Sequence, residues 1–227
     1  MTESPEVERN YWKKGFFGGK GKLKSEYQLL NGKRNGKGTL YWESGMKELD
    51  SNWKNGQRDG LHTTWYESGV KSSESQYKDD KQNGLFTSWY ESGSKWGECY
   101  YVNGIIDGLM TKWYESGEKM LEVNYKNGKE EGLETSWYES GEKWKEDYYK
   151  NGLPDGLATR WLENGTKLGE INFKNGKQEG LATIWYESGE KKEETCYREG
   201  KEHGLTIGWD EGGNKTYELN YLNGKQQ

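Results

Sequence analysis

The feature that most constrains this chain is a repeat of 24 residues. The copy from Gly132 to Asp155, GLETSWYESGEKWKEDYYKNGLPD, represents the rest, and no insertion interrupts the series. The glycines that open the copies are Gly36, Gly60, Gly84, Gly108, Gly132, Gly156, Gly180 and Gly204. A strict period of this length predicts an array of stacked units rather than an ordinary globular domain.

Each copy contains two segments in which side chains alternate with a period of two. In Gly132–Tyr138, Leu133, Thr135 and Trp137 fall on one side, and Lys143–Lys150 alternates in the same way. This period, with Thr, Trp and Tyr enriched, predicts β-strands. Because no segment shows the 3.6-residue period of a helix, we expect an all-β fold.

The connections between these segments carry turn signals. Asn151-Gly152 opens one connection, and the other is Glu139–Gly141, which ends in glycine. Asn-Gly is a strong hairpin signal, and a three-residue hairpin loop favours glycine at its left-handed position. The sequence therefore predicts an elongated array of 24-residue β-hairpins that forms a twisted antiparallel meander, or solenoid. We also expect two aromatic columns, represented by Trp137 and Tyr149, to pack as a spine.

The array is expected to cover residues 21–227, as about eight repeats and a terminal half repeat whose last strand is Lys215–Leu222. Residues 1–20 match the repeat poorly, so they are interpreted as an N-terminal tail and cap. Terminal units of repeat arrays are commonly atypical because one side lacks a neighbour.

Composition excludes several classes of protein. Only 30% of the residues are hydrophobic, which alone would indicate disorder, but 12 Trp and 17 Tyr argue for a folded chain. The net charge is −5 and no basic run is present, so we expect no nucleic-acid partner and no binding to anionic membranes. There is neither a transmembrane stretch nor a signal-peptide core, which predicts a cytoplasmic protein unless a leader has been removed.

The pattern Gly-x-x-x-x-Trp-Tyr-x-x-Gly followed by Tyr-x-Asn-Gly-x-x-x-Gly resembles the MORN repeat, and most closely its bacterial variant form. The resemblance covers residues 21–227. It departs from the common MORN unit in its period of 24 rather than 23 residues, and in having histidine before the closing glycine only at His203. The resemblance implies an antitoxin or immunity partner. Other MORN proteins are linked to phosphoinositide membranes, dimerisation and scaffolding.

Candidates for catalysis are few. His62 and His203 lie in different columns about six units apart, so no Ser-His-Asp group can form, and neither Cys99 nor Cys196 has metal-ligand spacing. The glutamates that recur with the repeat, such as Glu139 and Glu146, are expected to cap turns or to pair with the lysine column. We therefore predict a non-enzymatic protein with no catalytic residue, no metal site and no cofactor.

The residues that interrupt the repeat are the candidate site. Two sets recur 48 residues apart: Trp96, Tyr100, Ile105 and Ile106 (the Trp96 set), and Trp144, Tyr148, Leu153 and Pro154 (the Trp144 set). The tryptophans share a column with Ser72, Met120, Leu168 and Lys192, and the other members mostly replace polar residues of other copies. One interpretation is duplication of a two-repeat block, with these side chains only thickening the packing. The other is a protein-binding patch, because aromatic residues with polar rims are typical of interface centres.

Three functions remain open from the sequence. The first is a protein–protein interaction module, most concretely an antitoxin or immunity partner that covers a toxin. The second is a structural scaffold or adhesion protein that self-associates, with homo-oligomers forming through the ends of the array. The third is a carbohydrate- or lipid-contacting module, in which exposed Trp and Tyr stack on sugar rings. Repeats determine shape but not target, so the partner is not identified.

Overall fold

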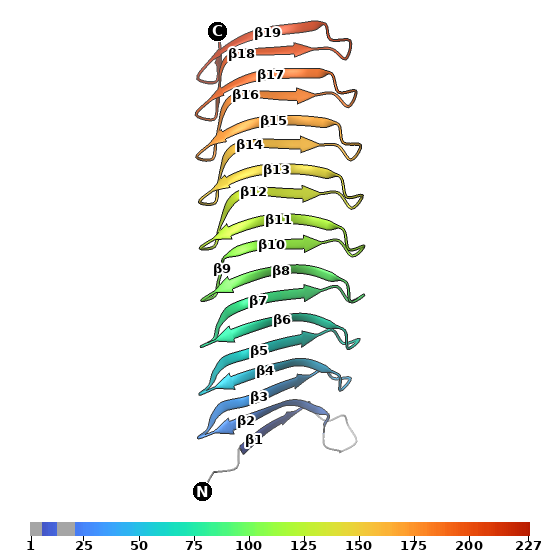
Figure 1. The fold of residues 1–227 in the computed structure, drawn as a ribbon, viewed down its shortest axis with the longest axis vertical. Coiled ribbons are helices and arrows are strands. Elements are labelled where there is room, and N and C mark those ends of the chain that lie inside the picture. Colours follow the sequence, from blue (N-terminus) through green and yellow to red (C-terminus); the bar gives the residue numbers. More distant parts are fainter. Residues whose placement is uncertain (1–5, 13–20) are drawn as a thin grey trace. The chain divides into compact units, whose positions relative to one another are not determined.

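The computed structural model describes residues 6–12 and 21–227, and the expected tail and cap lies outside these ranges except for residues 6–12. The chain divides into two compact units, Met1–Gly108 with Glu115–Gly117, and Leu109–Tyr114 with Glu118–Gln227. In each unit, antiparallel strands follow one another in chain order as an open hairpin meander (Figure 1). The predicted all-β class and hairpin meander are therefore confirmed.

The strands alternate between two lengths, as the repeat predicts. In the first unit they are β1 (Glu6–Tyr11), β2 (Leu23–Leu30), β3 (Lys33–Tyr41), β4 (Lys47–Lys54), β5 (Gln57–Trp65), β6 (Lys71–Lys78), β7 (Lys81–Trp89), β8 (Lys95–Val102) and β9 (Ile105–Ile106). In the second they are β10 (Gly108–Trp113), β11 (Lys119–Lys126), β12 (Lys129–Trp137), β13 (Lys143–Lys150), β14 (Leu153–Trp161), β15 (Lys167–Lys174), β16 (Lys177–Trp185), β17 (Lys191–Arg198), β18 (Lys201–Trp209), β19 (Lys215–Leu222) and β20 (Lys225–Gln226).

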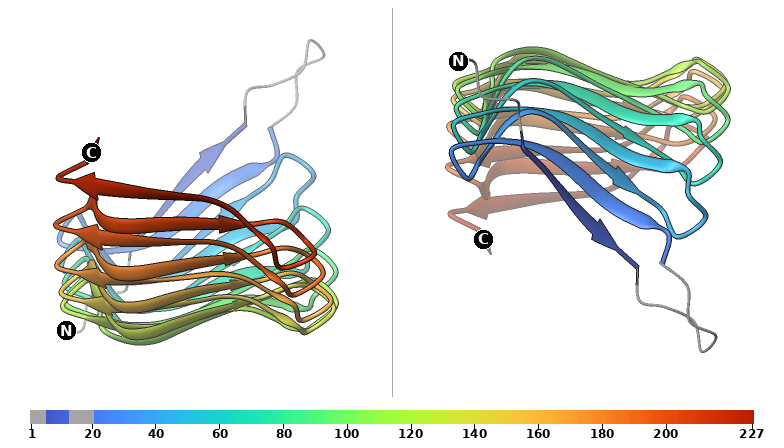
Figure 2. Two further views of the ribbon diagram at one scale, coloured as in Figure 1. Left: turned by 90° about the horizontal axis from the view of Figure 1, so that it is seen from above. Right: turned by 90° about the horizontal axis from the view of Figure 1, so that it is seen from below.

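The turns have the geometry that their residues favour. Asn151 and Gly152 have φ angles of 53° and 81°, both in the left-handed region that a two-residue type I′ hairpin requires. At the other end of β12, Gly141 has a φ of 89° and donates its N–H to the carbonyl of Tyr138 at 3.0 Å. The strands joined by these turns curve along their length rather than lying flat (Figure 2).

The two sides of the sheet are chemically different. On one side, cross-strand pairing joins Thr135 to Glu146 and Leu133 to Tyr148, and we call it the threonine face. The side that carries Ser136, Asp147 and Tyr149 is called the variable face, because its central residues change from repeat to repeat. Buried residues lie at the centre of both faces and are mostly small, as with Thr135, Ser136 and Ala158.

The prediction that the two aromatic columns pack together as a spine is wrong. Trp137 alternates with Leu133 and Thr135 on the threonine face, whereas Tyr149 pairs with Gly132 on the variable face. Both aromatic side chains are half-buried, so each column covers the margin of its own face. The most deeply buried side chains of the described residues are instead Val123 and Ser51, at 2% and 1% exposure. Within the described ranges, no helix has the length and apolar character needed to cross a membrane.

Candidate protein-binding surface

Three of the four residues in the Trp144 set are exposed on the threonine face or at its margin. Trp144 is 37% exposed, Tyr148 46% and Leu153 50%. Trp144 is the extra residue of a bulge in β13, because Ser136 pairs with Lys145 and Trp137 with Lys143. Bulges commonly redirect a side chain, and this one accompanies an exposed indole.

Tyr148 lies at the centre of an apolar surface. It pairs with Leu133 of β12. On its other side lies β14, where its neighbours Asp147 and Tyr149 pair with Ala158 and Pro154, so Tyr148 faces the bulge between them that includes Leu157. Both leucines are 38% exposed. A Cβ at Gly156 would lie 2.8 Å from the Cβ of Tyr148, so this glycine makes room for the tyrosine. We define the Tyr148 patch as Trp144, Tyr148, Leu133, Leu157 and Leu153.

The fourth member of the set, Pro154, does not belong to this surface. It pairs with Tyr149, which places it on the variable face, and it is half-buried. Leu153 pairs with Lys150, two residues beyond Tyr148, and so lies on the threonine side. The structure thus separates two neighbours, Leu153 and Pro154, that the sequence had grouped together.

The Trp96 set in the first unit repeats this arrangement. Trp96, Tyr100 and Ile105 are 39%, 49% and 50% exposed, and Tyr100 pairs with exposed Leu85. Ile106 pairs with Tyr101 on the variable face and is half-buried. The two-residue strand β9 is held by Asp107, whose N–H donates to the carbonyl of Tyr100 at 2.9 Å.

Sequence reasoning missed the leucines of this surface. Leucine occupies the column of Leu133 and Leu157 in every copy from Gly60 onward, and such regularity suggests a core position. The structure instead leaves this column at the surface in both units: Leu61, Leu85, Leu109, Leu133, Leu157, Leu181 and Leu205 are all at least 37% exposed. The opening glycine before each leucine was the available signal. A glycine within a strand often marks a bulge, and here regular pairing is interrupted at that position.

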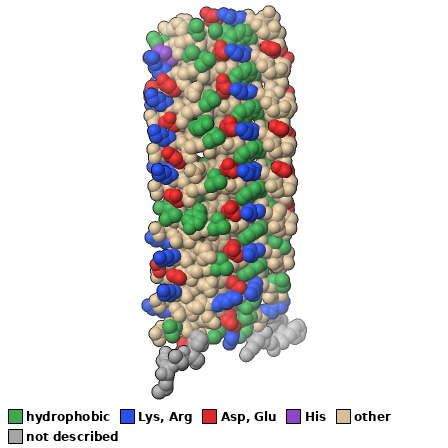
Figure 3. Space-filling view, in the orientation of Figure 1, with side chains coloured by type: hydrophobic (Ala, Val, Ile, Leu, Met, Phe, Trp, Pro, Cys, Tyr) green, Lys and Arg blue, Asp and Glu red, His purple; other side chains and the backbone are tan. Residues whose placement is uncertain are grey.

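Ion pairs border the apolar residues. Lys143 contacts Glu146, the residue between Trp144 and Tyr148, and the same pairing recurs three residues apart in each unit, as with Lys71 and Glu74 at 2.7 Å. Figure 3 shows these pairs as adjacent red and blue groups beside green apolar side chains. Exposed pairs of this kind contribute only about 0–1 kcal/mol, so they serve mainly as a polar rim. They also show that the glutamates of the Glu146 column pair with the lysine column.

Neither of the described histidines belongs to the Tyr148 patch or to the Trp96 set. His62 packs against Tyr77 with ring centroids 5.1 Å apart, and burial, followed by the nearby Arg58, lowers the pKa of His62. His203 lies in the second unit beside Arg198. Within residues 6–12 and 21–227, no cluster of three His, Cys, Asp or Glu side chains could hold a metal ion.

An open array of β-hairpins, with exposed apolar residues and recurring Tyr-x-Asn-Gly turns, defines a repeat protein. The sequence comparisons agree with this class. Residues 58–79, 82–103, 106–127, 130–151, 154–175 and 178–199 match the MORN repeat variant, and residues 11–26 and 28–47 match the MORN repeat. The variant segments cover more than half of the chain, which therefore belongs to the MORN repeat variant family. A comparison with curated proteins found no significant match.

Proposed function

We propose that this MORN repeat array is a non-enzymatic module that binds another protein through the Tyr148 patch. The observation that carries this proposal is the exposure of Trp144 and Tyr148 next to two exposed leucines. Aromatic side chains with adjacent aliphatic residues and a polar rim are typical of the centres of protein interfaces. The Trp96 set would supply a comparable contact on the first unit.

The finer proposal is an antitoxin or immunity partner, and its support is the resemblance to the variant form of the repeat. In that role the chain would cover a toxin and block its activity by forming a stoichiometric complex. An open sheet suits such a role because it can contact a partner without supplying catalytic groups. The expected result is that the purified chain inhibits the captured partner at a one-to-one ratio.

Other copies of the repeat supply the substitutions for the test, because they show which residues the fold accepts at each position. The column of Trp144 contains Ser72, and the column of Tyr148 contains Asn172. The double variant Trp144→Ser/Tyr148→Asn therefore uses residues that the same hairpin already accommodates. The chain and the double variant would be used as baits in lysate of the source cells, and the captured protein would be identified by mass spectrometry and purified.

We expect the purified partner to bind the double variant at least tenfold more weakly, about 1.4 kcal/mol, with an unchanged melting temperature. The matched control is Lys192→Ser, in the same column as Trp144, which should change neither property. Unchanged affinity in the double variant would contradict binding through the patch. A chain that only self-associates in light scattering would support a scaffold, and selective binding on a glycan array would support a carbohydrate module.

A further inference from the structure

The two faces of the second unit differ in how strictly they repeat. On the threonine face one cross-strand row alternates threonine and glutamate over six strands: Thr135, Glu146, Thr159, Glu170, Thr183 and Glu194. The corresponding row on the variable face reads Ser136, Lys145, Arg160, Gly169, Ile184 and Glu193. The hairpin therefore needs particular residues on one face and accepts many on the other.

Small residues on the variable face leave a hollow between β14 and β17. Ala158, Gly169 and Ala182 lie at neighbouring positions and surround a space of about 320 Å³. This volume is near the lower end of the range of ligand pockets, about 300–1,000 Å³. A hollow of this size suits one inserted side chain rather than a large cofactor.

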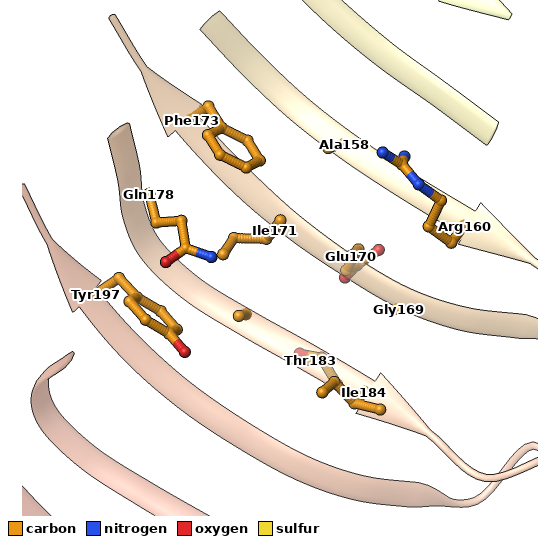
Figure 4. A pocket seen from close by; sticks show the side chains of 11 residues that line it. Ala158, Arg160, Gly169, Glu170, Ile171, Phe173, Gln178, Thr183, Ile184 and Tyr197 are labelled. Atoms are coloured by element: carbon orange, nitrogen blue, oxygen red, sulfur yellow. The ribbon is translucent and has the colours of Figure 1, made fainter. Parts of the chain in front are cut away.

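The walls of the hollow are mainly apolar. Ile171, Ile184 and Phe173 line it, and Figure 4 shows Phe173 and Tyr197 at one side with Arg160 at the other. The guanidinium of Arg160 is held by the buried carboxylate of Asp147, with one N–O distance of 2.9 Å, so mainly its aliphatic stem is available to the hollow. An apolar side chain could enter without displacing a polar group.

Two polar side chains at the rim, Tyr197 and Gln178, offer hydrogen-bond donors to an inserted segment. Among the described residues, neither the hydroxyl of Tyr197 nor the amide of Gln178 makes a hydrogen bond. Both are drawn at the edge of the hollow in Figure 4. As donors, they could bind backbone carbonyls on either side of an inserted side chain.

The charge beside the hollow is negative. Glu193 pairs with Ile184 and Glu202 with Tyr197 in the sheet, so both carboxylates belong to the variable face of β17 and β18. Within the described part of the chain, neither forms an ion pair. Burial, followed by Glu202 and Glu193, raises the pKa of Tyr197, which agrees with their proximity. The positive charge of Arg160 is already matched by Asp147.

We propose that the hollow binds a partner-protein segment that inserts one large apolar side chain and carries lysine or arginine on both sides of it. The apolar walls select the inserted residue, and Glu193 and Glu202 select its basic neighbours by charge complementarity. This inference rests on the proposed function, because it takes the occupant of the hollow to be part of a partner protein. It adds a second contact, on the face opposite the Tyr148 patch.

The test uses synthetic peptides as defined probes. The first is an acetylated, amidated peptide Gly-Ser-Lys-Phe-Lys-Ser-Gly, the second replaces Phe by Ala, and the third replaces both Lys by Glu. Each is titrated into the full chain labelled at isoleucine methyl groups. We expect saturable NMR shifts at Ile171 and Ile184 with the first peptide, and at least tenfold weaker binding of the other two.

Matched variants locate the binding. Gly169→Val should abolish the shifts by filling the hollow, because a Cβ at Gly169 would lie 3.6 Å from the nearest atom, the Thr183 carbonyl oxygen, and meets no clash. Asn172→Val, an exposed position between Ile171 and Phe173 on the opposite side of β15, should leave binding unchanged. Glu193→Gln/Glu202→Gln should weaken binding of the first peptide at least tenfold while leaving the melting temperature of the protein nearly unchanged.

The inference is overturned if the first peptide gives no saturable shift, if Gly169→Val still binds it, or if the Glu peptide binds equally well. Trp144→Ser/Tyr148→Asn should still bind the peptide. If that variant loses the captured partner while the wild type fails to bind any peptide, the proposed function stands and the hollow is rejected. If the peptides bind as expected and the Tyr148 patch variant keeps its partner, the patch is rejected and the hollow stands.

Discussion

The phenol of Tyr138 donates a hydrogen bond to the carbonyl oxygen of Trp161, 23 residues further along the chain, at 2.9 Å. The same bond joins Tyr114 to Trp137 and Tyr186 to Trp209, each at 2.8 Å. Because the acceptor is at the end of the next long strand, each tyrosine connects consecutive hairpins at their turns. These bonds explain why tyrosine follows tryptophan in most copies of the repeat.

Tyr138→Phe removes one of these connections and keeps the ring. We expect it to lower the free energy of unfolding by about 1 kcal/mol, the usual net contribution of such a bond, in denaturant titrations. The reverse change is available at Leu162, which occupies the tyrosine position in the next copy. Leu162→Tyr should raise stability, and if neither variant changed stability the bonds would contribute nothing measurable.

The left-handed turn residues should contribute measurably to stability. Asn151 has a φ of 53°, a conformation that costs most residues about 1–2 kcal/mol but that asparagine tolerates. Asn151→Ala is therefore expected to destabilise the chain by about 1 kcal/mol, measured by denaturant unfolding.

The adjacent exposed residue supplies the control, since Lys150→Ala should have little effect. Glu199 occupies the asparagine position at a φ of 51°. Its ion pair with Lys177 joins two well-exposed side chains and contributes little, so Glu199→Asn should raise the melting temperature. A lower melting temperature in that variant would show that the ion pair outweighs the turn preference.

Trp137→Ala should be moderately destabilising. Removing a fully buried tryptophan costs about 3–5 kcal/mol, but this indole is half-buried, so we expect about 2 kcal/mol. The substitution also removes the contact between the indole and Lys119, whose Nζ lies 5.7 Å from the ring centroid. Calorimetry and chemical denaturation measure the change, and a variant that melts like the parent would show that the tryptophan column contributes little.

Alkaline pH should weaken the contact between Tyr217 and Glu193. The hydrogen bond that Tyr217 donates to Glu193 raises the pKa of Tyr217 to about 12, from an ordinary value of 10.0. A raised pKa means that the folded state holds the phenolic proton more tightly. The stabilisation is therefore full below pH 10 and is lost as the pH rises towards 12.

NMR titration of labelled tyrosine rings measures this pKa, with Tyr217→Phe to assign the signal. Glu193→Gln should move the pKa of Tyr217 back towards its ordinary value. The effect on stability should be small because the contact is solvent-exposed. If Tyr217 titrated identically in the parent and in Glu193→Gln, the hydrogen bond would not form in solution.

The fold could be predicted from the sequence because each local signal agreed with the 24-residue period. Lys143–Lys150 and Lys215–Leu222 are strands with the predicted bounds, and Asn151-Gly152 forms the predicted turn. The strand predicted from Gly132 begins three residues earlier, at Lys129, because pairing with β11 resumes beyond the bulge that contains the glycine.

The details of the candidate site could not be read from the period. Whether Leu133 is buried depends on what covers its face, and a single sheet leaves that face open. Ile105 and Ile106 differ by one position, which places them on opposite faces, so grouping them by hydrophobicity concealed their different surroundings. The hollow near Gly169 depends on Ala158 and Gly169 of one repeat and on Ala182 of the next. Their columns hold larger residues in most other copies, so the period itself does not indicate a hollow.

The central claim is that the protein recognises a partner through the Tyr148 patch. Hydroxyl-radical footprinting of the chain, alone and saturated with its purified captured partner, tests this claim most directly. We predict that Trp144 and Tyr148 lose most of their reactivity in the complex, together with Leu133 and Leu157, whereas exposed Met46 in the first unit keeps its own. Unchanged reactivity of Trp144 and Tyr148 in the saturated complex would contradict the account.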